Sequence, residues 1–353
     1  MVEKGKEIAH MRIILLNGKL YVHKYKQAFQ TRDVFSLWGI LQLLRLYPGK
    51  LSDLDIMFQF GDRTTVLKSD YTGGATPPPV FHYCGDDSTY DIVFPDWSFW
   101  GWSEINIEPW VALSKELEEG SSRLKWIERE PYAYWKGNAQ VNQLRQDLTD
   151  CDVTKGKEWN ARIHNLDWDE ANKHGFSDTK LADQCNYRYK VYAEGAAWPR
   201  YYDFFSRDLL PMVHYWPINQ TNMCRSIKYA VDWGNNHTKE AQAIGKAASE
   251  YIQEQVKMTN VYDYMFHLLS EYGKLLKYKP TVPEGAVEMC LEKIVCDETG
   301  LDKKFKIESM VNRPMNRNPC DMPMNLSPDL EGHVKKKQKL IKQVEIWEES
   351  GKI

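Results

Sequence analysis

The chain has 353 residues, 27% of them charged, with a formal net charge of -3 and a sequence pI near 6.3. That length suits two ordinary domains, and the nearly balanced charge gives no general attraction to nucleic acid or to an anionic membrane surface. No apolar run approaches the roughly 20 residues that a membrane-spanning helix needs. Residues 1–12 lack the apolar centre of a signal peptide.

The first elements alternate between strand and helix patterns. Residues 12–16 and 19–22 flank Asn17-Gly18, the pair preferred in type I′ hairpin turns because both central residues need positive φ. Thr31 can cap a following helix, which Pro48-Gly49 ends. The apolar face of this helix holds Val34, Phe35, Trp38, Leu41 and Leu44.

Two short strands follow, at residues 55–60 and 80–84, with a loop at 72–79 between them. Strand, helix and strand in this order favour an α/β layer. Residues 116–122 are polar and contain glycine and serine, which is typical of a crossing between domains. The first domain is therefore placed at residues 1–118.

The second half of the chain is predicted to contain strands at residues 132–135, 187–192 and 213–218, and a helix at 141–148. Two amphipathic helices follow, with the apolar stripes Ala241, Ile244, Ala248, Tyr251 and Ile252, and Val261, Met265, Leu268, Tyr272 and Leu275. Both stripes are interpreted as core faces. The tail has little periodicity before a closing helix at 335–347, so the second domain is placed at 119–279 and the tail at 280–353.

Residues 90–110, YDIVFPDWSFWGWSEINIEPW, form the densest aromatic stretch. Pro95 and Gly101 disfavour both a helix and a central strand, so an ordered loop is expected. The carboxylates between the rings are Asp91, Asp96, Glu104 and Glu108. Bulky rings with carboxylates between them suit a sugar, which has an apolar face and a rim of hydroxyls; the alternative is an ordinary buried aromatic core.

Three motifs together resemble glycosyltransferase family 90, which includes the Rumi-type protein O-glucosyltransferases and the capsule-associated glycosyltransferases. They are YDIVFPDWSFWGW at residues 90–102, KWIEREPYAYWKGNAQVNQLRQDL at 125–148 and YKVYAEGAAW at 189–198. The resemblance runs in order from about Met11 to the C-terminal tail. It implies two Rossmann-like α/β domains of the GT-B type that face each other across a cleft, followed by a helical tail.

The same resemblance implies a chemistry and a compartment. It implies inverting, metal-independent transfer of glucose or xylose from a uridine nucleotide sugar, UDP-glucose or UDP-xylose, to a hydroxyl of a protein or a glycan. No cofactor and no nucleic-acid partner are expected. The implied location is the lumen of the endoplasmic reticulum or Golgi. Because no N-terminal address or membrane anchor of longer relatives is visible, this chain is expected to be a shortened form.

Asp62 is the candidate catalytic base. It follows a predicted strand, and ligand chemistry in open α/β sheets gathers beyond the carboxyl ends of strands. Glycosyl transfer to a hydroxyl needs a group that takes the acceptor proton, and a carboxylate suits that task. Arg63 is expected to keep this carboxylate ionised. The alternative is an ordinary Gly-Asp turn, but the resemblance implies a catalytic-base aspartate at this position.

A second candidate group consists of Lys136, Gly137, Asn138 and Arg145. A glycine lets the backbone approach a phosphate, a following helix offers free N–H groups, and Lys or Arg neutralises a diphosphate. A Lys-Gly pair is more often only a turn. The resemblance assigns this group, together with the small-residue turn at Gly195 and Ala196, to binding of the nucleotide-sugar donor.

The aromatic stretch is assigned to the acceptor side, with Asp91, Pro95, Asp96, Trp97, Phe99 and Trp100 as candidate contacts. Two other classes use the same residues. A glycoside hydrolase would take a pair of these carboxylates, and a non-catalytic sugar-binding protein would use the rings alone. Use of a uridine nucleotide sugar distinguishes the transferase from both.

Metal and cysteine patterns are uninformative. Asp-x-Asp occurs three times, at residues 53–55, 150–152 and 167–169, and no metal is assigned because the resembling family is metal-independent. Seven cysteines leave at least one thiol unpaired within the chain. Three glycosylation sequons begin at Asn219, Asn236 and Asn325.

The chain departs from the family after Trp198. Family members continue into a Ser- and Lys- or Arg-bearing helix and an apolar strand, whereas here Trp198 is joined directly to Pro199. An inner strand and its helix are therefore expected to be missing from the donor domain. Loss of an inner strand leaves backbone groups of its neighbours unpaired, so low stability and low activity are expected of this chain.

Overall fold

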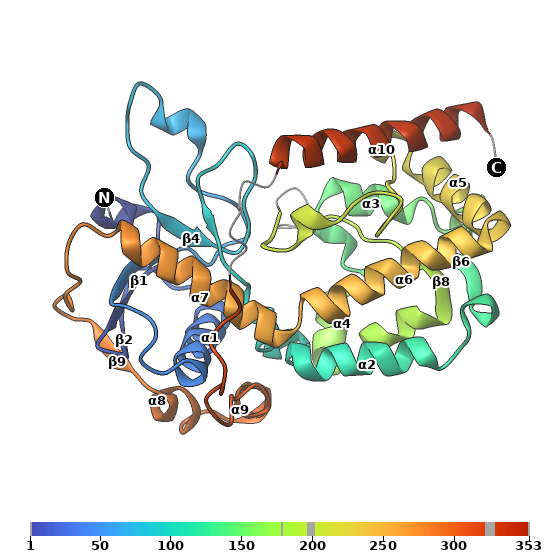
Figure 1. The fold of residues 1–353 in the computed structure, drawn as a ribbon. Coiled ribbons are helices and arrows are strands. Elements are labelled where there is room, and N and C mark those ends of the chain that lie inside the picture. Colours follow the sequence, from blue (N-terminus) through green and yellow to red (C-terminus); the bar gives the residue numbers. More distant parts are fainter. Residues whose placement is uncertain (1, 178, 196–201, 322–328, 352–353) are drawn as a thin grey trace. The chain divides into compact units, whose positions relative to one another are not determined.

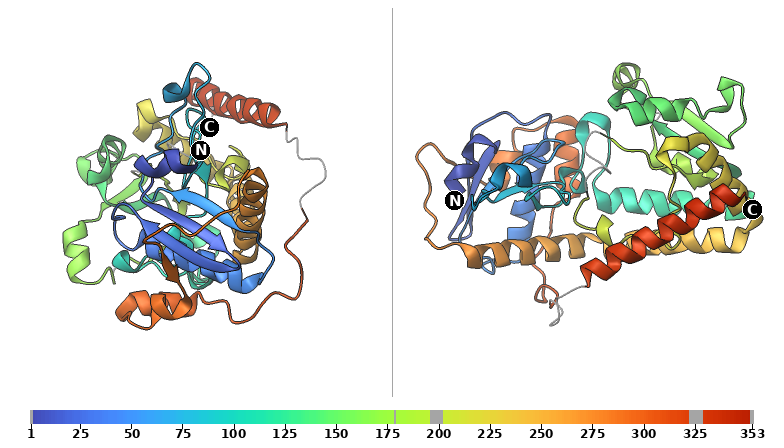
Figure 2. Two further views of the ribbon diagram at one scale, coloured as in Figure 1. Left: turned by 90° about the vertical axis from the view of Figure 1, so that its left-hand side faces the viewer. Right: turned by 90° about the horizontal axis from the view of Figure 1, so that it is seen from above.

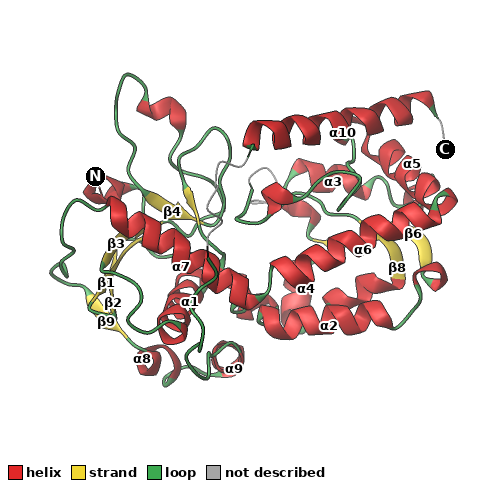
Figure 3. Cartoon of the chain, viewed as in Figure 1, coloured by secondary structure: helices red, strands yellow, loops and turns green. Residues whose placement is uncertain are grey.

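The structure is a computed structural model that describes residues 2–177, 179–195, 202–321 and 329–351. The chain divides into two compact units. Unit 1 comprises Met1–Leu113, Arg200–Arg207 and Lys257–Met322; unit 2 comprises Ser114–Pro199, Asp208–Val256 and Pro323–Ile353. Each combines a sheet with helices, as Figure 3 shows, and the predicted α/β class is confirmed. The ranges 1–118, 119–279 and 280–353 stay a prediction.

Unit 1 contains a six-stranded mixed sheet in the order β5-β4-β3-β1-β2-β9. Its strands are β1 (Met11–Leu16), β2 (Lys19–Lys24), β3 (Leu54–Phe58), β4 (Val80–His82), β5 (Ile92–Val93) and β9 (Val287–Met289). The pairs β3/β4 and β4/β5 are parallel, and the other pairs are antiparallel. The carboxyl ends of β3, β4 and β5 therefore share one edge of the sheet.

The β1–β2 hairpin follows from its turn. Asn17 and Gly18 have φ values of 51° and 74°, which is the left-handed geometry that a type I′ turn requires at both positions. The register then pairs Leu16 with Lys19 and Leu15 with Leu20. The predicted hairpin is confirmed, with both strands slightly longer than expected.

The helices of unit 1 are α1 (Arg32–Leu46), α7 (Met258–Leu275), α8 (Leu291–Val295) and α9 (Gly300–Glu308), labelled in Figure 1. The predicted helix after Thr31 is therefore present as α1, but the Thr31 side chain makes no capping bond. Its hydroxyl instead donates to Glu104 Oε2 at 3.0 Å. Gly39 lies against the Trp100 ring, which a Cβ at this position would overlap, so the two can pack closely only because residue 39 is glycine.

The tail after Pro280 is more structured than the sequence predicted. β9 pairs with β2, and α8 and α9 follow it within unit 1. Phe305 of α9 is fully buried and lies under Gly101, whose φ of 126° and missing Cβ make room for the ring. The prediction failed because these elements are too short to show a clear period in sequence.

One helix spans the boundary between the two units. α2 (Trp110–Ser122) is continuous through residues 116–122, the stretch predicted to cross between domains. The boundary between the two units falls inside this helix, between Leu113 and Ser114.

Unit 2 contains a parallel sheet in the order β7-β6-β8, with β6 in the middle. Its strands are β6 (Glu130–Gly137), β7 (Ala161–Asn165) and β8 (Tyr187–Lys190), and its helices are α3 (Gln143–Thr149), α4 (Trp168–Lys173), α5 (Met223–Asn236), α6 (Thr238–Gln255) and α10 (Leu330–Ser350). The predicted strand at 213–218 is wrong: Pro211 and Tyr215 form only an isolated bridge, and Pro211 and Pro217 lack the N–H groups that a ladder needs.

The helices of unit 2 are buried unequally. The sequence did not indicate α5, which buries Ile227 and Val231 in the core. α6 has no fully buried residue, so its stripe is a half-buried face rather than the predicted core face. The predicted closing helix is present as α10. Its C-terminal end lies against α5 (Figure 2), where Ser226 Oγ donates to Glu348 Oε1 at 2.6 Å.

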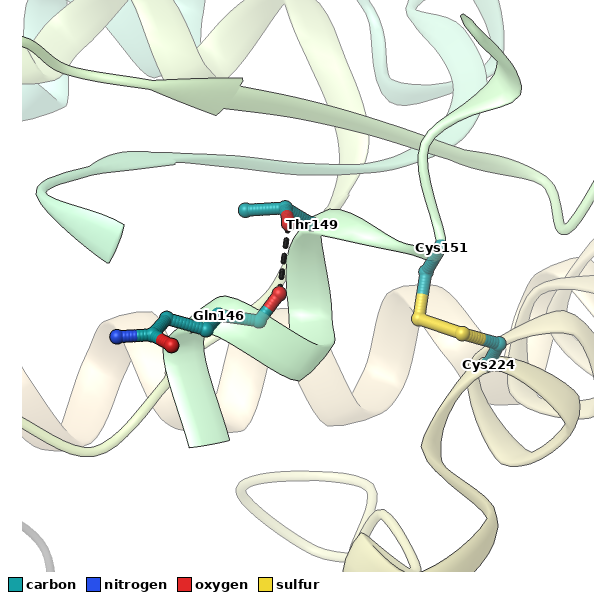
Figure 4. Close-up of a disulfide and its surroundings, with 4 residues drawn as sticks. All are labelled: Gln146, Thr149, Cys151 and Cys224. Carbon is teal, nitrogen blue, oxygen red and sulfur yellow. Dashed lines mark hydrogen bonds between the residues drawn. A yellow bond between two sulfur atoms is a disulfide. The ribbon is translucent and has the colours of Figure 1, made fainter. Parts of the chain in front are cut away.

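A disulfide joins Cys151, just after α3, to Cys224 in the first turn of α5 (Figure 4). Cys151 belongs to the core cluster that also contains Trp135, Leu148 and Ile163, and the partly buried Cys224 packs against that cluster. The remaining five cysteines are free thiols. In the described part of the chain, no helix is both long and apolar enough to cross a membrane.

Candidate functional site

Asp62 lies on the segment that leaves the carboxyl end of β3. β3 ends at Phe58, earlier than predicted, so several residues of irregular chain separate the strand from Asp62. The carboxylate is 38% exposed, and its Oδ1 atom lies 2.8 Å from Nη1 of Arg32, whose side chain is only 5% exposed. The cation paired with Asp62 therefore comes from the first turn of α1. The sequence had suggested the neighbouring Arg63 instead.

The guanidinium of Arg32 lies among aromatic rings. Its central carbon is 4.4 Å from the ring centroid of Trp97 and 5.1 Å from that of Phe29. Nη1 also donates to the backbone carbonyl of Phe60 at 3.3 Å. A buried cation between rings interacts with both of their negative faces, which stabilises it without water.

Asp96 is a buried carboxylate of this region, with 4% of its surface exposed. Burial raises its pKa to about 6, and the negative charge of Asp203 acts in the same direction, while hydrogen bonds from Ser98 and the charge of Arg32 oppose the shift. Ser98 donates to Asp96 Oδ1 through its amide at 3.0 Å and its hydroxyl at 2.6 Å. Asp96 therefore caps the short 3₁₀-helix Trp97–Phe99.

Asp203 reaches the same region from the segment Arg200–Arg207 of unit 1. Burial raises its pKa, and the backbone amides of Ser206 and Phe205 donate to its Oδ1 at 2.8 and 3.2 Å. Neither Arg32 nor Asp203 was predicted from the sequence. Their positions in sequence carry no pattern that distinguishes them from surface residues.

The candidate acceptor residues are mostly engaged in packing and caps. Asp91 accepts hydrogen bonds from the amides of Thr65 and Val66 at 3.1 and 3.0 Å. Trp100 is 0% exposed, and its indole N–H donates to Tyr262 at 2.9 Å. Pro95 and Trp97 are buried, and Phe99 is half-buried. This burial favours a core role for the stretch, and its acceptor contacts stay a prediction.

The four carboxylates considered for a hydrolase all have local partners. Besides the contacts of Asp91 and Asp96, Glu104 Oε1 accepts from the amide of Thr31 at 2.7 Å, and Glu108 pairs with Lys304 at 3.2 Å. These contacts give each of the four carboxylates a structural role.

The candidate donor residues gather at the carboxyl ends of β6 and β8. β6 lies between β7 and β8, so the order of the strands reverses at β6, and ligands of open parallel sheets bind at such points. Lys136 and Gly137 are the last residues of β6, and the turn begins at Asn138 rather than at Lys136 as predicted. Gly195 follows β8, while Ala196 and the Trp198–Pro199 joint lie outside the described residues.

The side chain of Arg145, in α3, forms hydrogen bonds to both the turn after β6 and the turn after β8. It donates to the carbonyls of Glu194 at 2.6 Å, Ala193 at 3.1 Å and Asn138 at 3.3 Å. Burial lowers its pKa from the usual value of an arginine. The Asn142 amide group adds bonds to the carbonyls of Glu194 at 2.9 Å and Gly195 at 3.0 Å. The Arg145 side chain therefore shapes the turn after β8, and its predicted contact with a diphosphate stays a prediction.

The Asp-x-Asp motifs serve the fold in this structure. Asp55 accepts two bonds from Arg12, Asp152 accepts from the Ile163 amide, and Asp167 caps α4. Within the described ranges, no group of three or more His, Cys, Asp or Glu residues is placed to hold a metal ion.

Known proteins provide an independent comparison. The family model described as Glycosyl transferase family 90 matches residues 1–348. Protein O-glucosyltransferase 1 of Homo sapiens is 24% identical over 281 residues, covering 70% of this chain and 69% of that protein. O-glucosyltransferase rumi of Drosophila melanogaster is 22% identical over 294 residues, covering 74% and 70%. The resemblance inferred from the motifs is thus confirmed, and the chain belongs to glycosyl transferase family 90 and is a glycosyltransferase.

Proposed function

We propose that this chain is an inverting, metal-independent protein O-glucosyltransferase. It moves glucose or xylose from a uridine nucleotide sugar to a hydroxyl of a protein or glycan. The observation that carries the proposal is the family match over residues 1–348, since the curated relatives are named as O-glucosyltransferases. The same match favours transfer over hydrolysis.

Asp62 is the general base of the proposed reaction. Its partly exposed carboxylate accepts the proton of the acceptor hydroxyl as that oxygen bonds to the anomeric carbon of the sugar. The bond from the anomeric carbon to the diphosphate breaks in the same step, and the electron pair leaves with the diphosphate. One displacement from the opposite face inverts the configuration.

The strand ends of unit 2 bind the donor in this proposal. Lys136 supplies positive charge to the departing diphosphate, and Gly137 and Gly195 let the backbone approach it. Arg145 supports the site by holding the carbonyls of the turn after β8. A GT-B type fold with two Rossmann-like domains is part of the same proposal.

The proposed compartment is the lumen of the endoplasmic reticulum or Golgi, and the partners are a nucleotide sugar and a protein or glycan acceptor. The Cys151–Cys224 disulfide supports this location, because disulfides persist in oxidising compartments. We further propose that this chain turns over slowly, since the segment expected after Trp198 supplies donor contacts in the family.

The test is a panel of radiolabelled uridine nucleotide sugars, including UDP-glucose and UDP-xylose, scored by release of UDP and by transfer of label. We expect one of these two donors to be used, at a rate that a chelator does not change. Release of free sugar from a glycan, with no donor consumed, would instead identify a hydrolase. Binding of glycans without any turnover of donors would identify a sugar-binding protein.

A further inference from the structure

We infer that Arg32 is the positioning residue of the reaction: its buried guanidinium fixes Oδ1 of Asp62 and leaves Oδ2 to take the acceptor proton. This inference rests on the proposed function, because it assigns a second residue to the base of that reaction. Sequence neighbours suggested Arg63 for the role, whereas the contacts of the folded chain select a residue of α1.

One nitrogen of Arg32 donates two hydrogen bonds to the segment that follows β3. Nη1 donates to Asp62 Oδ1 at 2.8 Å and to the carbonyl of Phe60 at 3.3 Å. Phe60 and Asp62 lie on the same stretch beyond β3, so the guanidinium fixes both the path of the backbone and the direction of the carboxylate.

The guanidinium is itself immobilised. Trp97 and Phe29 contact it through their rings, and the Arg32 carbonyl accepts bonds from the hydroxyls of Ser36 at 2.8 Å and Tyr83 at 3.2 Å. An exposed ion pair of two flexible side chains contributes little because both partners move and water screens them. Here only the carboxylate is reached by solvent, so the pair has one fixed partner and one reactive partner.

The two oxygens of Asp62 differ in their surroundings. Oδ1 faces Arg32, whereas Oδ2 has no hydrogen-bond partner in the parts of the chain that the structure describes. A general base must have a lone pair open to the acceptor at hydrogen-bond distance. The arrangement assigns that lone pair to Oδ2.

The test is a double-mutant cycle of Arg32→Ala, Asp62→Asn and the double variant, with UDP release from UDP-glucose or UDP-xylose and water as the acceptor. Asp62→Asn should lower kcat by about a hundredfold or more. Arg32→Ala should lower kcat by about 10- to 100-fold, the scale of a misplaced catalytic group, with little change in the donor KM. In the Asp62→Asn background, Arg32→Ala should cost less than about threefold, because a residue that acts through Asp62 has nothing left to position.

Arg45→Ala is the matched control, since Arg45 lies in the last turn of the same helix, where its Nη1 donates to Met310 Sδ at 3.7 Å. It should keep the wild-type kcat. Arg32→Lys keeps the charge but loses the planar group between the rings, so it should recover only part of the lost rate. Melting temperatures of all variants separate loss of fold from loss of positioning.

Two failures are distinguishable. Additive losses in the cycle, or a wild-type kcat in Arg32→Ala, overturn the role of Arg32 while the proposed function stands. To allow for slow turnover, the same variants are also made in a chain that carries the helix–strand segment of a curated relative after Trp198. Absence of UDP release from both wild-type forms overturns the proposed function and this inference with it.

Discussion

Asp62 and Asp96 show how surroundings divide the tasks of two carboxylates in unit 1. Asp62 is partly exposed and faces a guanidinium, so it has a cationic partner and can still be reached by an acceptor. Asp96 is buried, caps a short helix through Ser98, and has its pKa raised to about 6. The first arrangement suits a base that must meet a substrate, and the second suits a structural group that is easily protonated.

Replacing Asp96 by asparagine should stabilise unit 1 more at pH 8 than at pH 4. Because the folded state raises the pKa of Asp96 from 3.8 to about 6, its stabilising contribution is complete below 3.8 and is lost as the pH rises through about 6. The asparagine side chain would keep an acceptor for Ser98 without the buried charge. The shift corresponds to at most about 3 kcal/mol between the two pH values.

The measurement is chemical unfolding of wild type and Asp96→Asn at both pH values, compared as a difference so that other titrating groups cancel. An equal effect of the substitution at pH 4 and pH 8 would show that the Asp96 carboxylate titrates as it does in the unfolded chain.

At the site, the sequence identified groups that follow strand ends and missed their distant partners. Asp62, Gly137 and Gly195 were found because they come after strand patterns. Arg32 and Asp203 reach their positions only when α1 and residues 202–207 pack within unit 1. No local period records such a contact.

Elements were predictable where local chemistry and burial agree. Asn17-Gly18 determines the β1–β2 hairpin by itself. The helices α1 and α7 each show a long helical period of apolar residues, and several of those residues are buried. β9 and α8 have three and five residues, too few for a period to show. The apolar run at 213–218 resembles a strand in composition, but prolines at 211 and 217 remove ladder donors.

Arg145→Ala should weaken binding of UDP by about 1.5–3 kcal/mol, the range for hydrogen bonds to charged groups. The side chain links α3 to the turns after β6 and β8, so its loss frees the carbonyls of Asn138, Ala193 and Glu194. Calorimetric titration with UDP measures the change. Arg162→Ala is the control, because Arg162 pairs with Glu158 at the surface of the same unit. Unchanged UDP affinity in Arg145→Ala would remove the turn after β8 from the donor site.

Removing the disulfide should destabilise unit 2 by about 4 kcal/mol, the chain-entropy value for a closed loop of this size. The linked cysteines are separated by 73 residues and lie in the core between α3 and α5. The double variant Cys151→Ala/Cys224→Ala is compared with wild type by urea unfolding. Cys296→Ala, which removes an exposed free thiol, should have no such effect. A double variant as stable as wild type would show that the core alone holds α3 and α5 together.

At the scale of the whole molecule, the two units differ in how completely their sheets are built. Unit 1 has six strands drawn from segments far apart in sequence, and its tail completes one edge through β9. Unit 2 has three parallel strands, with β8 at one edge of the described sheet. Parallel sheets are usually covered on both faces and continued by further strands. The family resemblance implies a further helix and strand after Trp198, and this stays a prediction.

The last prediction is that inserting such a helix–strand segment after Trp198 raises both the stability of unit 2 and its affinity for UDP. In the described part of the sheet, β8 has a neighbour on one side only, so an added strand can pair with its other side; α6 has no fully buried residue. Each apolar side chain that the segment buries contributes about 1.5–3 kcal/mol, which is large beside a total domain stability of about 5–15 kcal/mol. Calorimetric melting and UDP titration compare the two chains, and a segment of the same length made of glycine and serine is the control. We expect only the native-like segment to raise the melting temperature and the UDP affinity. Equal, cooperative melting and equal UDP affinity of the two chains would mean that three strands already make unit 2 complete.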